Sequence, residues 1–322
     1  MIVGYIILLV VGLVLLVKAS DIFVDAASSL ATKLRMPKML IALTVAAFGT
    51  CAPELAISFK SMASGNYDVT LANVVGSCIV NILLVVGVAS LVKPIKVKEH
   101  TVKKELPLLV GVTGLFFLLL DDRVFRGRPE NGLSRVDATM LLAAFGIFLI
   151  YIFIVVHQHK KKTKKKMRRE KAKYTLPVSL FLILTTIVVI IIASDIVVDN
   201  AVAIANEIGI SQKIITMTAI VVGTSLPELT MTVAASKKGE FDLAVGNIIG
   251  TNIFNICIVL GLPILIFGGF TSNAFNIVDM VVVLLAAVVY YWFGRSSHRL
   301  ERLEGMLMVA IFAAYYTYLF LV

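Results

Sequence analysis

The sequence predicts an all-α polytopic membrane protein whose ten transmembrane helices form two inverted five-helix repeats, with helices 2 and 7 broken. The first observation is composition: only 16% of the residues are charged and the mean hydropathy is +0.96, whereas about 25% charged residues are usual in soluble domains. The second is that apolar runs recur along all 322 residues, each near the roughly 20 residues that span a bilayer as a helix. The third is a motif, GTCAPE at residues 49–54, which returns as GTSLPE at residues 223–228.

Ten apolar segments account for most of the chain. Their runs are continuous rather than alternating, which disfavours a β-barrel. The first run has no basic start and continues into SDIFVDAA without a cleavage site, so it is expected to remain as a span. The ten spans are expected at about residues 2–19, 39–60, 69–92, 106–121, 136–156, 175–194, 212–235, 242–267, 277–294 and 304–321.

Basic residues orient these spans. Alternate loops hold 23 of the 30 Lys and Arg residues, including the run HKKKTKKKMRREKAK at 159–173. Loops rich in Lys and Arg stay in the cytoplasm. The chain is therefore expected in the cell (plasma or inner) membrane, multi-pass, with both termini outside and the loop 159–173 cytoplasmic. The net charge of +10 then needs no nucleic acid, because a basic loop beside anionic lipid explains it.

The two copies of the motif belong to a longer internal repeat. A single offset of 174 residues, from position 54 to position 228, aligns both copies over nearly seventy positions. Each copy contains five spans, so the second must enter the membrane from the opposite side, which is typical of secondary transporters. The expected division is 1–158 for the first repeat, 159–174 for the basic loop and 175–322 for the second repeat. The matched pairs are Ser20/Ser194, Asp21/Asp195, Asp25/Asp199, Pro53/Pro227, Asn73/Asn247, Gly76/Gly250, Asn81/Asn255 and Gly87/Gly261.

Each copy of the motif places a carboxylate inside a span. A charge at the bilayer centre costs at least about 2.5–3.5 kcal/mol, so Glu54 and Glu228 need a reason to be there. Pro53 and Pro227 have no N–H and break the helix, and irregular backbone is tolerated at that depth where it lines a cavity. Carbonyl, hydroxyl and carboxylate oxygens together suit a hard cation.

The span after each motif adds polar side chains at helical spacing. Asn73, Ser77 and Asn81 recur every four residues and therefore share one helix face. The second copy repeats this face with Asn247, Thr251 and Asn255. Glycines in both spans allow close helix approach. Four acids near span ends are expected to cap, pair or border an ion entrance, with a structural role favoured: Asp21, Asp25, Asp195 and Asp199.

These motifs resemble the cation/calcium exchanger superfamily, and within it the prokaryotic, minimal sodium/calcium exchanger branch. The resemblance covers the whole chain and implies a core of spans 2, 3, 7 and 8, across which spans 1 and 6 slide. It implies that Glu54 and Glu228 share a calcium ion with the backbone carbonyls of Thr50 and Thr224. The remaining ion ligands that it implies are Ala47, Ser77, Asn81, Val221, Ser225, Thr251 and Asn255, with Cys51 in doubt.

Two departures from the family pattern affect ion selectivity. Cys51 stands where some relatives have serine, and sulfur is a poor ligand for hard sodium. Asn255 stands where some relatives have aspartate, so only two formal charges remain at the centre, which disfavours potassium co-transport.

The resulting expectation is an antiporter, not an enzyme, that exchanges sodium for calcium by alternating access. Two carboxylates balance one calcium or two sodium ions, and a third sodium would make exchange electrogenic. The alternatives are calcium/proton exchange and potassium-dependent sodium/calcium exchange. An intramembrane enzyme lacks a nucleophile or metal arrangement, and a channel is disfavoured by the repeats. No cofactor, nucleic acid or obligate protein partner is expected, and the three cysteines, all within spans, predict no disulfide framework.

Overall fold

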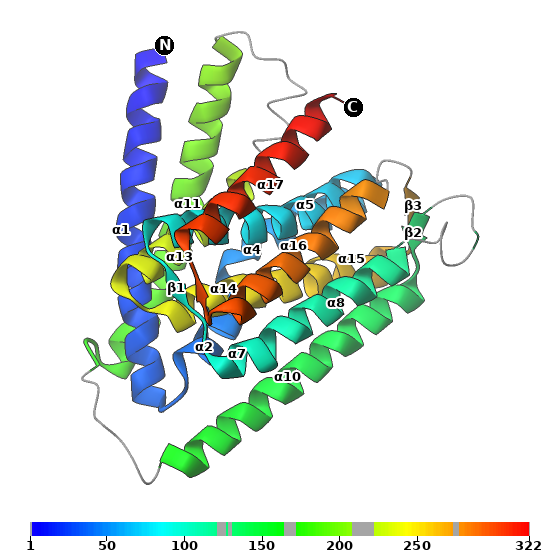
Figure 1. Cartoon of the computed structure of the whole chain (residues 1–322). Coiled ribbons are helices and arrows are strands. Elements are labelled where there is room, and N and C mark those ends of the chain that lie inside the picture. Colours follow the sequence, from blue (N-terminus) through cyan, green and yellow to red (C-terminus); the bar gives the residue numbers. More distant parts are fainter. Residues whose placement is uncertain are drawn as a thin grey trace.

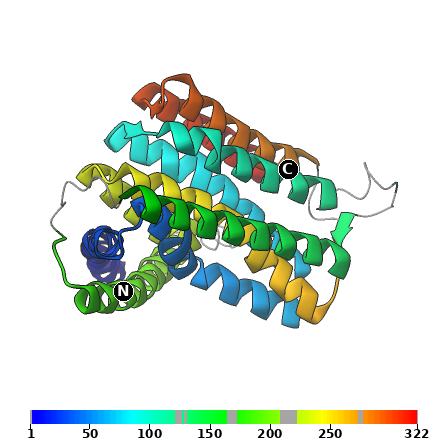
Figure 2. The same cartoon turned by 90° about the horizontal axis from the view of Figure 1, so that it is seen from below.

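The computed structural model describes residues 2–120, 127, 131–163, 172–207, 222–272 and 277–321, and this part of the chain is almost entirely helical. Two long helices, α1 (Ile2–Leu34) and α11 (Leu176–Glu207), contact each other along their length. They stand upright beside a stack of the remaining helices, which lie at a steep angle to them (Figure 1). Figure 2 looks almost along this pair and places it at one side of the stack.

Both long helices extend well past the spans expected at 2–19 and 175–194. In α1 the helix continues beyond the polar residues Asp21 and Asp25. Beyond them, Ala26, Ala27 and Leu30 are buried and continue one apolar face at helical spacing. That face packs against α11 and, to a smaller extent, against helix α13 (Leu226–Lys238). Packing against the protein therefore extends the helix where hydropathy alone would end it.

The second span is a broken helix. Its first part consists of α2 (Lys38–Ile41), a π-helical segment η1 (Ala42–Ala46) and α3 (Ala47–Thr50). After Cys51 the chain turns by 47° into α4 (Ala52–Ala63). Pro53 lies in the first turn of α4, where its missing N–H is tolerated.

The seventh span has the same local geometry at its motif. Helix α13 (Leu226–Lys238) follows Ser225, whose backbone angles of φ −88° and ψ 2° nearly equal those of Cys51, φ −78° and ψ 2°. Pro227 lies in the first turn of α13, as Pro53 does in α4. The preceding part of this span, residues 212–221, lies outside the described residues.

The third and eighth spans form the buried centre of the stack. Each contains an α-helix, a π-helical segment and a second α-helix, in matching order. The first is α5 (Tyr67–Ile79), η2 (Val80–Val86) and α6 (Gly87–Val92); the second is α14 (Phe241–Phe254), η3 (Asn255–Leu260) and α15 (Gly261–Phe267). π-Helical segments are rare and are frequent at functional sites.

Five further helices surround this centre. Helix α8 packs against α16, α17 covers α6 and η2, and α10 covers α15 and η3. Their bounds are α7 (Glu99–Lys103), α8 (Glu105–Leu120), α10 (Arg135–Thr163), α16 (Ile277–Ser296) and α17 (Arg302–Leu321). Two short antiparallel strand pairs, absent from the all-α prediction, connect loops: β1 (Ile95–Lys96) with β4 (Arg299–Leu300), and β2 (Asn131–Leu133) with β3 (Phe270–Ser272).

The helices are of the membrane type. In the described residues six helices are long and apolar enough to cross a bilayer, and the bent pair Lys38–Thr50 and Ala52–Ala63 would make a seventh. Helix α8 has only 16 residues, and the start of the seventh span is not described. Every expected span coincides with helix where it is described, but the number of ten crossings remains a prediction.

Candidate cation site

The two motif carboxylates lie at the centre of the molecule. Glu54 and Glu228 are completely buried, each in the first turn of the helix that follows its break. The carboxylates are close enough to repel each other electrostatically. Within the described residues, none of their four oxygens has a hydrogen-bond partner. Helix N-termini favour negative charge only modestly, by about 0.3–2 kcal/mol. Two buried, unpartnered carboxylates must be neutralised, either by protons or by a bound cation.

Each copy of the motif supplies a threonine to the carboxylate of the other copy. The side chain of Thr224 lies near the Glu54 carboxylate, and the side chain of Thr50 lies near the Glu228 carboxylate. Neither contact satisfies hydrogen-bond geometry at the carboxylate oxygens. The Thr50 hydroxyl is directed to the Ala46 carbonyl at 3.2 Å and the Ala47 carbonyl at 3.4 Å. The two motifs thus build one shared site rather than two separate ones.

The polar faces of the third and eighth spans complete this centre. Segment η2, which contains Asn81, packs against α13, and η3, which begins at Asn255, packs against α4. Each carboxylate helix therefore contacts the asparagine segment of the other copy. The buried side chains of these spans that have polar atoms without a partner among the described residues include Ser77, Asn81, Thr251 and Asn255.

The earlier asparagine of each polar face has a supporting role. Asn73 donates to the backbone carbonyl of Glu54 at 3.0 Å and to the Ser58 hydroxyl at 3.2 Å. Its counterpart Asn247 donates to the Thr232 hydroxyl at 3.4 Å. These side chains hold α5 to α4 and α14 to α13. Sequence spacing placed them on the same face as the ion-ligand candidates but did not reveal that their amides bind the neighbouring helix.

The other candidate ligands lie around the same break. Ala47 and Cys51 are buried, and Ser225 is buried with no partner for its hydroxyl in the described residues. The Cys51 thiol donates to the Thr251 carbonyl at 3.8 Å, so sulfur does lie beside a candidate ligand. Thr224 is half-buried, and Val221 lies outside the described residues.

Helix α11 covers both motif glycines. A Cβ at Gly49 would lie 2.4 Å from the Ile187 side chain, and one at Gly223 would lie 2.5 Å from the Val198 side chain. The Ser194 hydroxyl donates to the Gly223 carbonyl at 2.9 Å, which is the carbonyl that Pro227 cannot satisfy. The repeat identified Ser194 only as a matched position; its partner is a contact between two spans.

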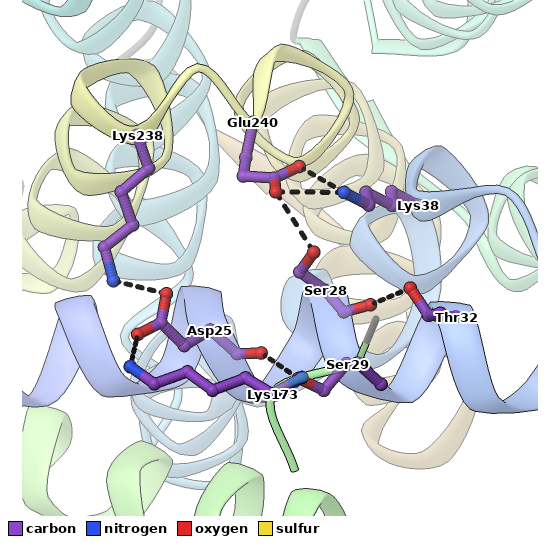
Figure 3. Close-up of a pocket in the computed structure, with 9 residues that line it drawn as sticks. Asp25, Ser28, Ser29, Thr32, Lys38, Lys173, Lys238 and Glu240 are labelled. Atoms are coloured by element: carbon purple, nitrogen blue, oxygen red, sulfur yellow. Dashed lines mark hydrogen bonds and ion pairs between the residues drawn. The ribbon is translucent and has the colours of Figure 1, made fainter. Parts of the chain in front are cut away.

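The four acids near span ends behave differently from the motif carboxylates. Asp25 bonds to Lys173 at 2.6 Å and to Lys238 at 2.7 Å (Figure 3). Asp21 is 3.9 Å from the same Lys238. Asp195 and Asp199 are exposed on α11. The structural role expected for these acids therefore holds for Asp25, which pairs with lysines outside the cation centre.

The donor set of the centre suits an oxygen-ligated ion. Among the residues that the structure describes, no three His, Cys, Asp or Glu side chains gather as a metal cluster. The two carboxylates lie among amide and hydroxyl side chains, and oxygen atoms of these kinds are the ligands that calcium and other hard cations use.

Comparison with known proteins supports this reading. The sequence model of the family described as "Sodium/calcium exchanger protein" matches residues 4–154 and 178–321. The chain is 36% identical over 288 residues to the inner membrane protein YrbG of Escherichia coli, covering 88% of this chain and 86% of that protein. It is 28% identical over 341 residues to the sodium/calcium exchanger MaX1 of Methanosarcina acetivorans, covering 97% of each.

A solved structure matches over the same extent. The sodium-calcium exchanger NCX_Mj, soaked with 10 mM Na+ and zero Ca2+, aligns with a TM-score of 0.80 and 28% identity, covering 98% of this chain and 99% of that one. Exchangers of this kind are transporters without a cofactor, so no enzymatic role is involved. The chain belongs to the sodium/calcium exchanger family.

Proposed function

We propose that this protein is an antiporter that exchanges sodium for calcium by alternating access, with ten spans arranged as two inverted repeats and helices 2 and 7 broken. The observation that carries the proposal is the pair Glu54 and Glu228, both fully buried and both without a hydrogen-bond partner among the described residues. Such a pair is costly at this depth unless it binds a cation. The names of MaX1 and NCX_Mj support sodium as the counter-ion.

The calcium ligands in this proposal are the two glutamates and the backbone carbonyls of Thr50 and Thr224. One sodium site uses Ala47, Thr50 and Ser77, and the other uses Val221, Thr224 and Thr251. Asn81 and Asn255 provide the central amide oxygens, and their burial without a described partner supports that role. Ser225 adds a hydroxyl ligand, and Cys51 occupies the matched position with a thiol.

Charge balance explains why exchange is strict. The two carboxylates are neutralised by one calcium ion or by two sodium ions, and a neutral, dry site crosses between the two access states at lower cost than a charged one. A third sodium bound by the flanking hydroxyls makes each cycle move net charge. The membrane potential then contributes about 2.3 kcal/mol per charge per 100 mV.

Access alternates when α1 and α11 move as a pair across the stack. The pair contacts the stack chiefly through α13, α2 and α3, and α11 lies over Gly49 and Gly223 at the two breaks. Because 23 of the 30 Lys and Arg residues lie in alternate loops, the face that carries the basic loop 159–173 is cytoplasmic and both termini are outside. The direction of net transport follows the ion gradients.

Radiolabelled calcium uptake into sodium-loaded proteoliposomes tests this function. Uptake should occur on dilution into sodium-free buffer, disappear when sodium is equal on both sides, and be abolished by Glu54→Gln. A Glu99→Gln variant, altered at an exposed surface acid, serves as the matched control and should transport normally.

The same vesicles separate the alternative couplings. Uptake that ignores sodium and follows an imposed pH gradient would assign calcium/proton exchange instead. Uptake that requires potassium together with sodium would assign potassium-dependent exchange. If about three sodium ions leave for each calcium ion that enters, each cycle carries one positive charge outward. An inside-positive potential, set with a potassium ionophore, should then accelerate calcium uptake, and an inside-negative potential should slow it.

A further inference from the structure

A cluster of charged and hydroxyl side chains connects α1 to the stack at one face of the molecule, away from the cation centre. The cluster comprises Asp25 and Ser28 of α1, Lys38 of α2, Lys173 of the segment before α11, Lys238 of α13 and Glu240 of the α13–α14 turn. These residues, with Ser29, Thr32 and Ala172, line a cavity of about 560 Å³. We refer to them as the Asp25–Glu240 cluster.

Two contacts in this cluster cross from α1 to the stack. Lys238 of α13 bonds to Asp25 at 2.7 Å, and Glu240 accepts from the Ser28 hydroxyl at 3.1 Å. Figure 3 shows Lys238 and Lys173 on opposite oxygens of Asp25, and Glu240 between Ser28 and Lys38. Asp25, Lys238, Lys38 and Glu240 are each 22–26% exposed. Ion pairs at this depth are screened less than fully exposed ones.

The segment before α11 is attached to the same place. The backbone N–H groups of Lys173 and Tyr174 donate to the Ser29 hydroxyl at 3.2 and 3.3 Å, and Lys173 pairs with Asp25. The hydrogen bond to Asp25 raises the pKa of Lys173, so this lysine retains its charge. The cluster therefore joins both members of the α1–α11 pair to each other and to the stack.

The internal repeat allows a comparison with the opposite face. At the offset of 174 residues, Asp25 corresponds to Asp199, but Lys238 corresponds to Ser64 and Glu240 to Asn66. The position of Ser28 is occupied by Val202. Ser64 cannot form an ion pair with Asp199, and Val202 has no hydroxyl to donate to Asn66. In the described residues Asp199 has no ion pair; residues 208–221, which include Lys213, lie outside them.

We propose that the Asp25–Glu240 cluster is a one-sided closure device, which favours the state closed at the basic face over the state closed at the opposite face. In an inverted repeat the two access states exchange the conformations of the two copies. The ion pair that Asp25 and Lys238 form in one state corresponds to Asp199 and Ser64 in the other state. Because serine carries no charge, that second ion pair cannot form. The inverted arrangement, and the identification of the basic face as cytoplasmic, rest on the proposed function.

One hydroxyl contact between α1 and the stack also has no counterpart at the matched positions of the other copy. Ser20 of α1 donates to Thr230 of α13 at 2.9 Å, across the boundary between α1 and the stack. The matched Ser194 instead donates to Gly223, and position 56, which corresponds to Thr230, is an alanine. The additional cross-contact again lies only between α1 and α13.

The test measures the separation of α1 from the stack at the basic face. Spin labels are attached at Lys33→Cys on α1 and Lys96→Cys on β1, two exposed positions outside the cluster. The three native cysteines are buried and should remain unlabelled. Double electron–electron resonance then gives the distance distribution in lipid nanodiscs. Lys238→Ser and Asp25→Asn should each increase the ratio of the separated to the closed population by about 5- to 30-fold, as expected for losing one or two kcal/mol.

A variant on the opposite face provides a matched test. Ser64→Lys introduces the lysine that the first copy lacks, opposite Asp199, and should also increase the separated population at the basic face because it favours the other state. Adding Asp199→Asn should reverse this effect. An unchanged distribution in Lys238→Ser, or a Ser64→Lys effect that persists without Asp199, would overturn the proposal.

The outcome does not depend on which ions are exchanged. The distance measurement requires no flux, so a shift seen in a protein that fails sodium-driven calcium uptake would retain the closure device and reject only the ion assignment. Normal sodium-driven uptake together with a distance distribution that is unchanged in Lys238→Ser would retain the ion assignment and reject the closure device.

Discussion

The side-chain amide of Asn73 donates a hydrogen bond of 3.0 Å to the backbone carbonyl of Glu54, from the span that follows the motif to the helix that carries the carboxylate. A second bond, to the Ser58 hydroxyl, fixes the amide from the other side. The matched Asn247 makes one longer bond, of 3.4 Å, to Thr232. Both asparagines are buried, so both act where water cannot replace a lost bond.

Asn73→Ala should therefore cost more than Asn247→Ala. Removing a buried hydrogen-bond partner costs about 1–3 kcal/mol, and Asn73 loses two bonds where Asn247 loses one long bond. Thermal unfolding in detergent measures the stability difference. Calcium uptake measures its effect on the site, where Asn73→Ala should raise the half-saturating calcium concentration. Equal losses for the two variants would show that the bond to the Glu54 carbonyl has no special role.

Glu228→Gln should abolish calcium exchange. One remaining carboxylate cannot neutralise a divalent ion, and a net charge on the occupied site adds at least about 2.5 kcal/mol to crossing, equivalent to a loss of nearly two orders of magnitude in rate. The control is Asp242→Asn, at an acid in the first turn of α14 that pairs with Lys98 far from the centre. Sodium-driven uptake in proteoliposomes measures both variants. Retained exchange in Glu228→Gln would remove this residue from the site.

Gly250→Ala should push α14 away from the second span and lower the thermal stability of the protein. An added Cβ would lie 2.8 Å from the Leu43 Cα and carbonyl oxygen and 2.9 Å from the Ala47 Cβ, and backbone atoms cannot move aside as a flexible side chain would. Overpacking of this kind costs about 1–3 kcal/mol. Gly111→Ala in α8 is the control, since nothing lies within 4 Å of its Cβ position. That variant should be neutral or slightly stabilising, because alanine favours helix; thermal unfolding distinguishes the two.

Cys51→Ser should shift the ion preference of the site from soft toward hard cations. The thiol lies beside the Thr251 carbonyl, and soft ligands favour soft ions. Replacing it with a hydroxyl should weaken inhibition of calcium uptake by cadmium by about tenfold, equivalent to about 1.4 kcal/mol. The reciprocal Ser225→Cys should strengthen that inhibition. Cadmium inhibition that is the same in all three proteins would mean that sulfur at these positions does not contact the ion.

The sequence predicted the helices of the described chain well because hydropathy and breaking residues are local signals. Pro53 and Pro227 each lie two residues after a turn, at Cys51 and Ser225. Hydropathy did not indicate that α1 continues beyond Asp21 and Asp25; the continuation buries Ala26, Ala27 and Leu30 against α11 and α13. The two short strand pairs were missed because each joins loops that lie far apart in the chain.

The membrane class, the candidate site residues and the matching of the two copies were determined by the sequence alone, because composition, residue type and a constant offset are one-dimensional properties. Only the tertiary structure decided which residues of one copy contact which residues of the other. Segment η2 of the first copy packs against α13 of the second, and η3 of the second copy packs against α4 of the first. Lys238 pairs with Asp25 although more than two hundred residues separate them. A repeat predicts that two units are alike, but the contacts between them depend on how their surfaces pack, and small differences such as Lys238 against Ser64 then make the two faces unequal.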